Sequence, residues 1–298
     1  MAGIDVGGSA VKLGVMAADG SQREERSFAV EAGRSAETIF AHAAETLAEL
    51  AGGPLPGVGV GLPGLLDREA GCVRHSPNLP WLVDAPVREL IGEGLGIPME
   101  RVILENDANV AALGEQWLGA ARGARHLLLL TLGTGIGGGL ILDGRLFIGE
   151  GLAGEIGHVT VDPEGRPCGC GSRGCLETLA SASAARRRAI ERGLPEEAPG
   201  DLELLAALGR AHAGPERELL EHVGYDLGRG LADVVDLLDV RTFVFGGGFS
   251  AALDVLEPGI RRALGEWSYG ERIAGVRLVR ASLGGSAGWI GAARLLLG

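Results

Sequence analysis

The sequence predicts an α/β protein of two domains, each of which opens with two strands joined by a glycine turn. Residues 3–20 run as apolar strand, glycine turn, apolar strand and an Asp-Gly pair, which is a strong hairpin signal. The same succession recurs at residues 126–144. This recurrence indicates an internal duplication, and 298 residues suffice for two domains of ordinary size. Two such turns, each facing the other, would clamp a phosphate chain between them.

The rest of the chain alternates strand-like and helical patterns. Apolar residues at helical spacing, such as Ile39, Phe40, Ala43 and Leu47, mark the first helix. Predicted helices cover residues 36–51, 84–95, 108–121, 177–192, 201–212, 215–239, 252–267 and 287–297. Predicted strands outside the hairpins begin at residues 23, 58, 101, 241 and 276. Residues 71–82 are expected to form a polar, proline-broken loop, and residues 195–200 a linker.

The composition restricts the classes of partner. Hydrophobic residues make up 46% of the chain, enough for a core, and the 52 glycines suggest close backbone approaches and tight turns. The net charge of −12 argues against a nucleic-acid or anionic-membrane surface, although a nucleotide needs only a local cradle of donors. We see no secretory segment and no apolar run of membrane length, so we expect a cytoplasmic protein.

A cluster of metal-ligating residue types follows the second hairpin. His158, Cys168, Cys170 and Cys175 lie within eighteen residues, in a loop rich in glycine. Thiolates and an imidazole are the ligands that Zn²⁺ takes in a closed four-ligand structural site. A disulfide is the rival interpretation, but three Cys cannot all pair with one another. The spacing therefore favours a structural zinc loop at residues 158–175.

Two carboxylates flank this loop. Glu155 lies three residues before His158, and Glu177 lies two residues after Cys175. A metal that pins the ligands would also fix both acids in space, which favours a functional role. The alternative is that both are solvated surface acids, which is the usual environment of Glu.

The first glycine turn carries groups suited to phosphate. The Gly7-Gly8-Ser9 turn leaves backbone N–H groups for a phosphate, and Lys12 adds a cation. Asp5, at the end of the first strand, can reach a Mg²⁺-bound water. An ordinary hairpin with a surface Asp and Lys is the alternative, but the recurrence of the pattern favours function. A third glycine turn, at residues 246–248, can lie flat against an adenine or ribose, or can be a simple strand-to-helix turn.

An acidic tip ends the strand predicted at residues 101–108. Asp107 is either the N-cap of the following helix or a general base that takes a proton from an alcohol. Asn106 would be its sugar-binding neighbour. Asn78, in the proline-broken loop, either hydrogen-bonds a polyol or forms an Asx turn, and the sequence leaves both open.

These motifs together resemble the ROK family (repressors, open reading frames and sugar kinases) of the actin-like, ribonuclease-H-like ATPase superfamily. The resemblance covers essentially the full length of the chain. The matching stretches are residues 5–12, 105–109, 132–139 and 154–158, the Cys loop with Glu177, and residues 246–248. Several long motifs in the right order make the resemblance specific.

The resemblance implies an α/β, two-domain actin-like fold with an active-site cleft between the domains. The domains would be residues 1–108 plus 285–298, and residues 109–284 with the zinc loop. The family is usually a homodimer. Asp107 would be the catalytic base, Asp5 would help position Mg²⁺, and Gly247 would line the nucleoside of ATP. The sugar-binding residues would be Asn78, Asn106, Glu155, His158 and Glu177, and the residues lining the phosphates would be Gly7, Gly8, Lys12, Thr134 and Gly135.

The implied activity is an ATP-dependent hexose kinase, with glucose as the expected substrate. Related sugars, namely N-acetylmannosamine, N-acetylglucosamine or fructose, are the alternative, and polyphosphate stays open as the donor. A sugar-responsive repressor is disfavoured, because no DNA-reading segment precedes the first strand. Two departures from the family pattern are visible: Ser9 replaces the common Thr, and Trp81 stands one residue early, which would reshape an edge of the sugar pocket.

Overall fold

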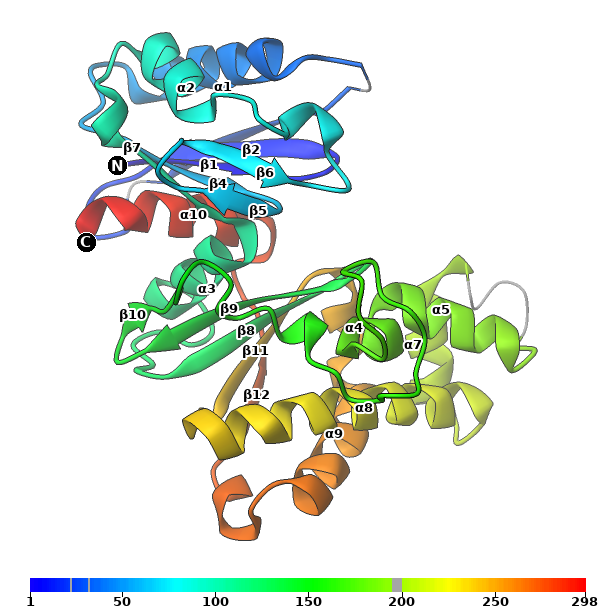
Figure 1. Cartoon of the computed structure of the whole chain (residues 1–298). Coiled ribbons are helices and arrows are strands. Elements are labelled where there is room, and N and C mark those ends of the chain that lie inside the picture. The colour runs from blue at the N-terminus through cyan, green and yellow to red at the C-terminus, as the bar shows by residue number, and fades with distance from the viewer. Residues whose placement is uncertain (22, 32, 195–199) are drawn as a thin grey trace. The chain divides into compact units, whose positions relative to one another are not determined.

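The computed structural model describes residues 1–21, 23–31, 33–194 and 200–298 (Figure 1). The predicted linker at 195–200 lies outside the described residues except for its last position. The chain divides into two compact units. The first unit comprises Met1–Gly123, Gly139–Ala153 and Ser282–Gly298, and the second comprises Ala124–Gly138 and Gly154–Ala281. The sequence-based boundary instead assigned residues 109–123 and 139–153 to the second domain. The predicted cleft between domains stays a prediction.

The first unit is built on a five-stranded sheet. Its strand order is β3 (Glu24–Ala29), β2 (Ala10–Val15), β1 (Ala2–Val6), β4 (Val58–Leu62) and β7 (Val102–Asn106). Strands β1 and β2 form the predicted antiparallel hairpin, and β4 and β7 run parallel to β1. Because β4 is buried along its whole length, its residues are apolar or glycine rather than alternately polar.

Glycine in these strands lets a helix lie directly on the sheet. A Cβ at Gly3 would stand 1.9 Å from the carbonyl oxygen of Trp289, and one at Gly59 would stand 1.8 Å from that of Ala292. Both carbonyls belong to α10 (Ala287–Arg294), so a larger side chain at either strand position would push this helix away. At these two positions glycine allows the close backbone approach that the glycine content of the sequence suggested.

Helices cover both faces of this sheet (Figure 1). Helices α1 (Ala36–Ala51) and α2 (Val87–Leu95) lie on one face, and α10 lies on the other with α3 (Asp107–Trp117) packed against it. Helix α1 starts where the Ser35 side chain accepts from the Thr38 N–H and ends at Gly52, whose φ is +60°. Its apolar stripe enters the core as predicted.

One strand of a small two-stranded sheet lies in the stretch expected to be a loop. Strand β6 (Cys72–His75) pairs antiparallel with β5 (Leu65–Asp67). The prediction of an irregular loop over residues 71–82 was therefore wrong in its first part. Trp81, in the short helix that follows, packs against Phe40 with ring centroids 6.3 Å apart, so it belongs to the edge of the core.

The second sheet has the order β10 (Arg145–Leu146), β9 (Ile136–Leu142), β8 (Leu127–Leu132), β11 (Thr242–Gly246) and β12 (Arg277–Arg280). Strand β11 runs parallel to both β8 and β12. Strand β9 passes from the second unit into the first at residue 139. The second predicted hairpin is thus present as β8 and β9.

The α-helices that the structure describes in the second unit are α4 (Leu176–Ala180), α5 (Ala182–Glu191), α7 (Leu202–Ala211), α8 (Pro215–Leu238) and α9 (Leu253–Trp267). Helices α8 and α9 meet at backbone distance, because a Cβ at Gly224 would stand 2.0 Å from the Leu256 carbonyl oxygen. The single helix predicted at 177–192 is two helices. Ser181 is extended between them and caps α5 by accepting from the Ala184 N–H at 3.1 Å.

Membrane insertion through a helix has no support in this structure. Among the described residues, no helix combines the length and the apolar character needed to cross a bilayer.

Candidate active site and metal-binding cluster

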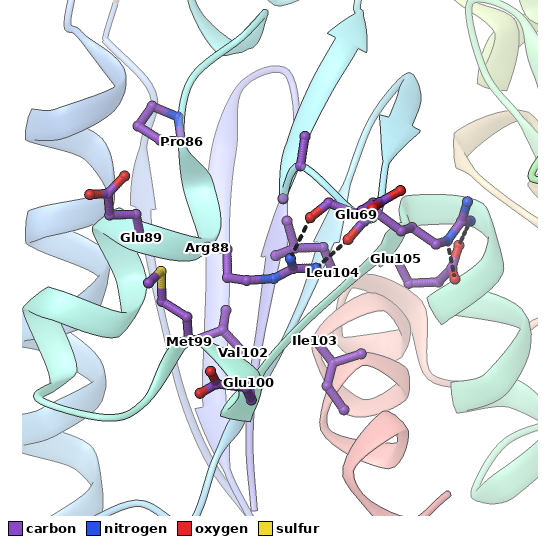
Figure 2. Close-up of a pocket in the computed structure, with 13 residues that line it drawn as sticks. Glu69, Pro86, Arg88, Glu89, Met99, Glu100, Val102, Ile103, Leu104 and Glu105 are labelled. Carbon is purple, nitrogen blue, oxygen red and sulfur yellow. Dashed lines mark hydrogen bonds and ion pairs between the residues drawn. The ribbon is translucent and has the colours of Figure 1, made fainter.

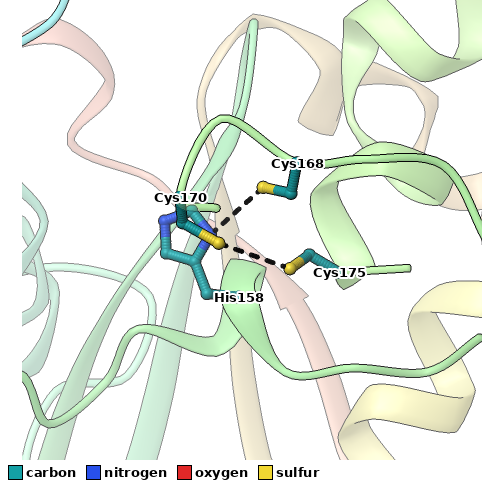
Figure 3. Close-up of side chains that lie close together, drawn as sticks. All are labelled: His158, Cys168, Cys170 and Cys175. Carbon is teal, nitrogen blue, oxygen red and sulfur yellow. Dashed lines mark hydrogen bonds between the residues drawn. The ribbon is translucent and has the colours of Figure 1, made fainter. Parts of the chain in front are cut away.

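The predicted metal ligands gather in the second unit. One ligand atom from each of His158, Cys168, Cys170 and Cys175 lies within 4.8 Å of all the others (Figure 3). The His158 Nδ1 is 3.7 Å from the Cys168 Sγ, and the Sγ atoms of Cys170 and Cys175 are 3.6 Å apart. None of the four cysteines in the chain forms a disulfide. The disulfide alternative is therefore not what this structure shows.

Backbone turns bring the ligands together. The Cys168 N–H donates to the Ser172 carbonyl at 2.8 Å, and the Gly171 N–H donates to the Cys168 carbonyl at 3.1 Å, which closes the loop on itself. Gly174 has a φ of +60°, and a Cβ there would stand 1.5 Å from the Asp162 carbonyl oxygen. Only glycine fits this position, so the fold of the loop depends on Gly174.

The donor set fits a tetrahedral zinc ion. With Zn–S bonds of about 2.3 Å, two thiolates of a tetrahedron stand roughly 3.8 Å apart, close to the observed sulfur separation. Burial raises the pKa of the Cys168 and Cys175 thiols, whereas the Ser172 N–H lowers the pKa of the exposed Cys170 thiol. A bound cation would offset the cost of burying these two thiols, whose pKa is raised, in their thiolate form.

Glu177 lies between the cysteine cluster and the second glycine turn. Its Oε1 accepts from the Cys168 Sγ at 3.0 Å and lies 3.7 Å from the His158 Nδ1. Its Oε2 accepts from the Ile136 N–H at 3.4 Å. Sequence reasoning linked Glu177 to the ligands but missed the turn, because the two stretches are 41 positions apart. One carboxylate therefore contacts both features.

Glu155 stands on the other side of the histidine. Its Oε2 lies 3.9 Å from the His158 Nε2, the ring nitrogen that faces away from the sulfurs. Burial raises the pKa of Glu155, the nearby Glu177 raises it further, and His158 opposes the rise. His158 and the two flanking acids thus form one group of polar side chains, as the spacing predicted.

The glycine turn between β8 and β9 is tightly built. The Gly133 N–H donates to the Gly135 carbonyl at 3.0 Å, which leaves Thr134 at the tip. A Cβ at Gly135 would stand 2.5 Å from the Glu177 Oε2, so a larger residue here would displace the end of the Glu177 side chain. The turn thus presents its backbone beside the acid.

The third glycine turn follows β11. Gly247 has a φ of +78°, and a Cβ there would stand 2.4 Å from the Leu132 carbonyl oxygen. The next residues, Gly248 and Phe249, line a pocket of about 310 Å³ together with α7 and Arg280. This pocket provides a concave surface next to the residue predicted to contact a nucleoside.

The first unit brings a second set of predicted residues together. Asp5 pairs with Lys12 in the register of β1 and β2. Burial raises the pKa of Asp5 to about 7, with Asp107 adding to the rise and Lys12 opposing it. The Gly7 N–H donates to the Ala10 carbonyl at 2.9 Å and is therefore already used inside the turn. A Cβ at Gly8 would meet nothing within 4 Å, so that position is open.

The start of α10 also approaches this set, which the sequence analysis did not foresee. A Cβ at Gly285 would stand 2.5 Å from the Lys12 Nζ, and one at Gly288 would stand 2.2 Å from an Asp5 carboxylate oxygen. The Gly-Gly-Ser-Ala-Gly run at 284–288 was the feature of the sequence that could have indicated this close approach. Its glycines let the helix start pack on the two charged side chains.

Asp107 is the first residue of α3, and Asn106 is the N-cap. The Asn106 Oδ1 accepts from the N–H groups of Ala108 at 2.9 Å and Asn109 at 3.3 Å. The alternative that Asp107 is the cap is therefore wrong, because the preceding side chain fills that role. The helix N-terminus favours a negative charge at Asp107. Asn78 is exposed in a turn before the short helix Pro80–Leu82.

Glu105, two residues before Asp107 on β7, is a buried acid. From the sequence it was counted in the motif at residues 105–109 but was given no role. Glu105 is 5% exposed, and Arg68 pairs with it through two nitrogens, one of them 3.0 Å from Oε2. Its Oε1 also accepts from the Asn106 N–H at 2.8 Å and from the Asn109 Nδ2 at 2.9 Å. Glu105 and Arg68 line a pocket of about 560 Å³ (Figure 2). In the sequence, the only hint of a special role for Glu105 was an acidic residue within an otherwise apolar strand.

Two units of this kind, each with a glycine-turn hairpin on a mixed sheet, define the actin-like, ribonuclease-H-like class of two-domain ATPase folds. The model of the ROK family matches residues 1–298. The chain belongs to the ROK family, as the motifs indicated.

Individual relatives agree with this assignment. The chain is 36% identical to a glucokinase of Thermotoga maritima, over 99% of this chain and 96% of that protein. It is similar to the crystal structure of a ROK hexokinase from Thermus thermophilus, with a TM-score of 0.82, 37% identity, and coverage of 98% and 96%. It is also similar to a ROK family glucokinase from Streptomyces griseus in complex with glucose and AMPPNP, with a TM-score of 0.77, 34% identity, and coverage of 99% and 98%.

Proposed function

We propose that this protein is an ATP-dependent glucokinase that converts glucose to glucose 6-phosphate. The observation that carries the proposal is Asp107, a carboxylate at the start of α3, in a chain similar over nearly its full length to named glucokinases. The similar glucokinase structure contains glucose together with AMPPNP, an analogue of ATP. Sugar and ATP are therefore the substrates we infer for this chain.

Asp107 is the general base in this mechanism. It takes the proton of the sugar 6-hydroxyl as that oxygen attacks the γ-phosphorus, and the bond to the bridging oxygen of ADP breaks. Phosphoryl transfer asks the protein mainly to position the groups and neutralise charge. In this proposal the residues that bind the phosphates are Lys12, Gly8 with its open backbone, Thr134 and Gly135. Asp5 would help to position Mg²⁺, which would supply positive charge to stabilise the phosphates.

The sugar is held by Asn78, Asn106, Glu155, His158 and Glu177. In this proposal His158 would bind zinc through Nδ1, which lies beside the Cys168 Sγ, and would offer Nε2, which lies near Glu155, to a sugar hydroxyl. His158 and the three Cys would hold a structural zinc ion, which would stabilise the loop beside these acids. Gly247 and the neighbouring 310 Å³ pocket receive the nucleoside.

The proposal is tested by measuring ADP release with ATP and Mg²⁺ across glucose, mannose, fructose, N-acetylmannosamine and N-acetylglucosamine. We expect a strong preference for glucose. Preference for an N-acetyl sugar would keep the mechanism and overturn the substrate. If no sugar caused ADP release, ATP would be contradicted as the phosphoryl donor, and polyphosphate would be tested next.

The role of Asp107 is tested with Asp107→Asn. Loss of a general base lowers turnover by about 100-fold or more, while the variant stays folded and still binds ATP. Asp19→Asn is the matched control, since Asp19 is an exposed turn acid whose hydrogen bond to Ser21 an Asn also makes. Near-normal turnover of Asp107→Asn would rule out the proposed base.

A further inference from the structure

Glu105 needs a cationic partner, and Arg68 supplies it. The Glu105 side chain is 7% exposed and that of Arg68 is 26% exposed, so the pair is largely removed from water. The guanidinium contacts both carboxylate oxygens in a fork, with Nε 3.0 Å from Oε2. A buried carboxylate that loses such a partner is strongly destabilised. The position of Glu105 therefore depends on Arg68.

Glu105 in turn fixes the chain on both sides of Asp107. Its Oε1 accepts from the Asn106 N–H just before Asp107 and from the Asn109 Nδ2 just after it. The Asn109 amide is buried, and its Oδ1 has no hydrogen-bond partner among the described residues. Glu105 is thus the acceptor on which the buried Asn109 amide relies. A shift of Glu105 would move the first turn of α3 and Asp107 with it.

Arg68 comes from neither β7 nor α3, but from the turn that follows β5. That turn is closed by the Gly71 N–H on the Asp67 carbonyl at 2.9 Å and by the Ala70 N–H on the Asp67 Oδ1 at 2.8 Å. Arg88 of α2 donates to the backbone carbonyls of Arg68 and Glu69 (Figure 2). The turn is therefore anchored independently of the residues that Arg68 holds.

We propose that Arg68 and Glu105 are positioning residues that hold Asp107 in its reactive place. This inference rests on the proposed function, because Asp107 is the base in that proposal. The chain of contacts runs from Arg68 to Glu105, and from Glu105 to Asn106 and Asn109, which flank Asp107. A misplaced catalytic group costs rate even when substrates still bind.

The first test is Arg68→Ala against Arg74→Ala. Arg74 is the matched control, since it lies on the same hairpin and forms exposed ion pairs with Asp67 and Asp84. We expect Arg68→Ala to lower kcat by about 10- to 100-fold with little change in the KM for ATP. We expect Arg74→Ala to behave as wild type. Equal kcat values for the two variants would overturn the proposal.

The second test is chemical rescue. Arg68 and Glu105 line a pocket of about 560 Å³, so a small guanidinium added to the solution has access to the space that Arg68→Ala leaves. Methylguanidinium at millimolar concentration is expected to restore part of the lost kcat, and methylammonium, which lacks the fork, to restore less. Failure of both to restore activity would favour a general folding defect and contradict the positioning role.

A third measurement separates this inference from the proposed function. Hydrogen exchange at the Ala108 and Asn109 amides reports the first turn of α3 without any reaction. Arg68→Ala should accelerate exchange there, and Arg74→Ala should not. Unchanged exchange would overturn the positioning role whatever the activity. Faster exchange in a protein that phosphorylates no sugar would overturn the proposed function and leave the contacts from Arg68 to Asn109 standing.

Discussion

The carboxylate of Glu115 accepts from the backbone N–H of Ser282, at 3.0 Å on one oxygen and 3.1 Å on the other, across 167 positions of the chain. The same carboxylate accepts from the N–H groups of Leu283 at 2.8 Å and Ala120 at 2.7 Å. Glu115 is completely buried. It therefore joins the last turns of α3 to the segment by which the chain returns to the first unit.

We predict that Glu115→Gln lowers the free energy of unfolding by about 2–4 kcal/mol, because the new amide turns an N–H₂ group toward backbone donors. Urea unfolding measures the change. Glu93→Gln is the control, since Glu93 is exposed on α2. Equal unfolding curves for the two variants would show that the buried hydrogen bonds add no net stability.

A second prediction concerns pH and Asp5, whose pKa is raised to about 7. Between about pH 4 and 7 the folded state keeps a proton that the unfolded state has released, so stability falls as pH rises through this window. The decline amounts to at most about 4 kcal/mol. We expect Asp5→Asn to remove it in urea unfolding measured from pH 4 to 8.

Burial is the first cause of the Asp5 shift and Asp107 the second. Asp107→Asn should therefore shrink the pH-dependent decline without abolishing it. Parallel stability curves for wild type and Asp5→Asn would contradict the raised pKa.

A third prediction compares two glycines of the proposed zinc loop, residues 158–175. Gly174→Ala introduces a Cβ 1.5 Å from the Asp162 carbonyl oxygen at a φ of +60°, whereas a Cβ at Gly169 meets nothing within 4 Å. We expect Gly174→Ala to lose bound zinc and at least about 2 kcal/mol of stability. Gly169→Ala should keep both. Metal analysis and thermal unfolding give the answer, and an intact zinc content in Gly174→Ala would count against the dependence of the loop on this glycine.

A fourth prediction addresses the metal itself. Cys170→Ala removes one of the four candidate ligands, so we expect zinc to be lost and sugar affinity to fall more than ATP affinity. Calorimetric titration with glucose and with AMPPNP measures both affinities. Cys72→Ala is the control, since Cys72 is buried in β6 of the first unit. One zinc per chain retained in Cys170→Ala would contradict the four-ligand assignment.

Features coded by neighbouring residues could be predicted from the sequence. The hairpin of β1 and β2 and the bounds of α1 match the predictions, because turn glycines, capping residues and apolar spacing all act locally. The break between α4 and α5 does not act locally. There the Ala182 N–H donates to the Gly133 carbonyl at 2.9 Å, in a distant turn, and so leaves the helical path that residues 177–192 would otherwise follow.

The same distinction holds for the candidate site. The ligand cluster was predictable, because His158 and the three Cys lie close in sequence and share one chemistry. The partner of Glu105 lies 37 positions away on another turn, and nothing around Arg68 distinguishes it from a surface arginine. Contacts of this length follow from the assembled sheet, so the residues behind Asp107 became visible only in the structure.

Lys12 is the only lysine in the sequence, and it stands opposite Asp5 in the first hairpin. A reagent that modifies primary amines would therefore react with only one side chain in this protein, besides the N-terminal amine. A protein grown with isotope-labelled lysine carries one reporter, at the position where we place the phosphates. Binding of a phosphate group beside Lys12 could thus be followed through the signal of this one labelled residue, without any substitution in the chain.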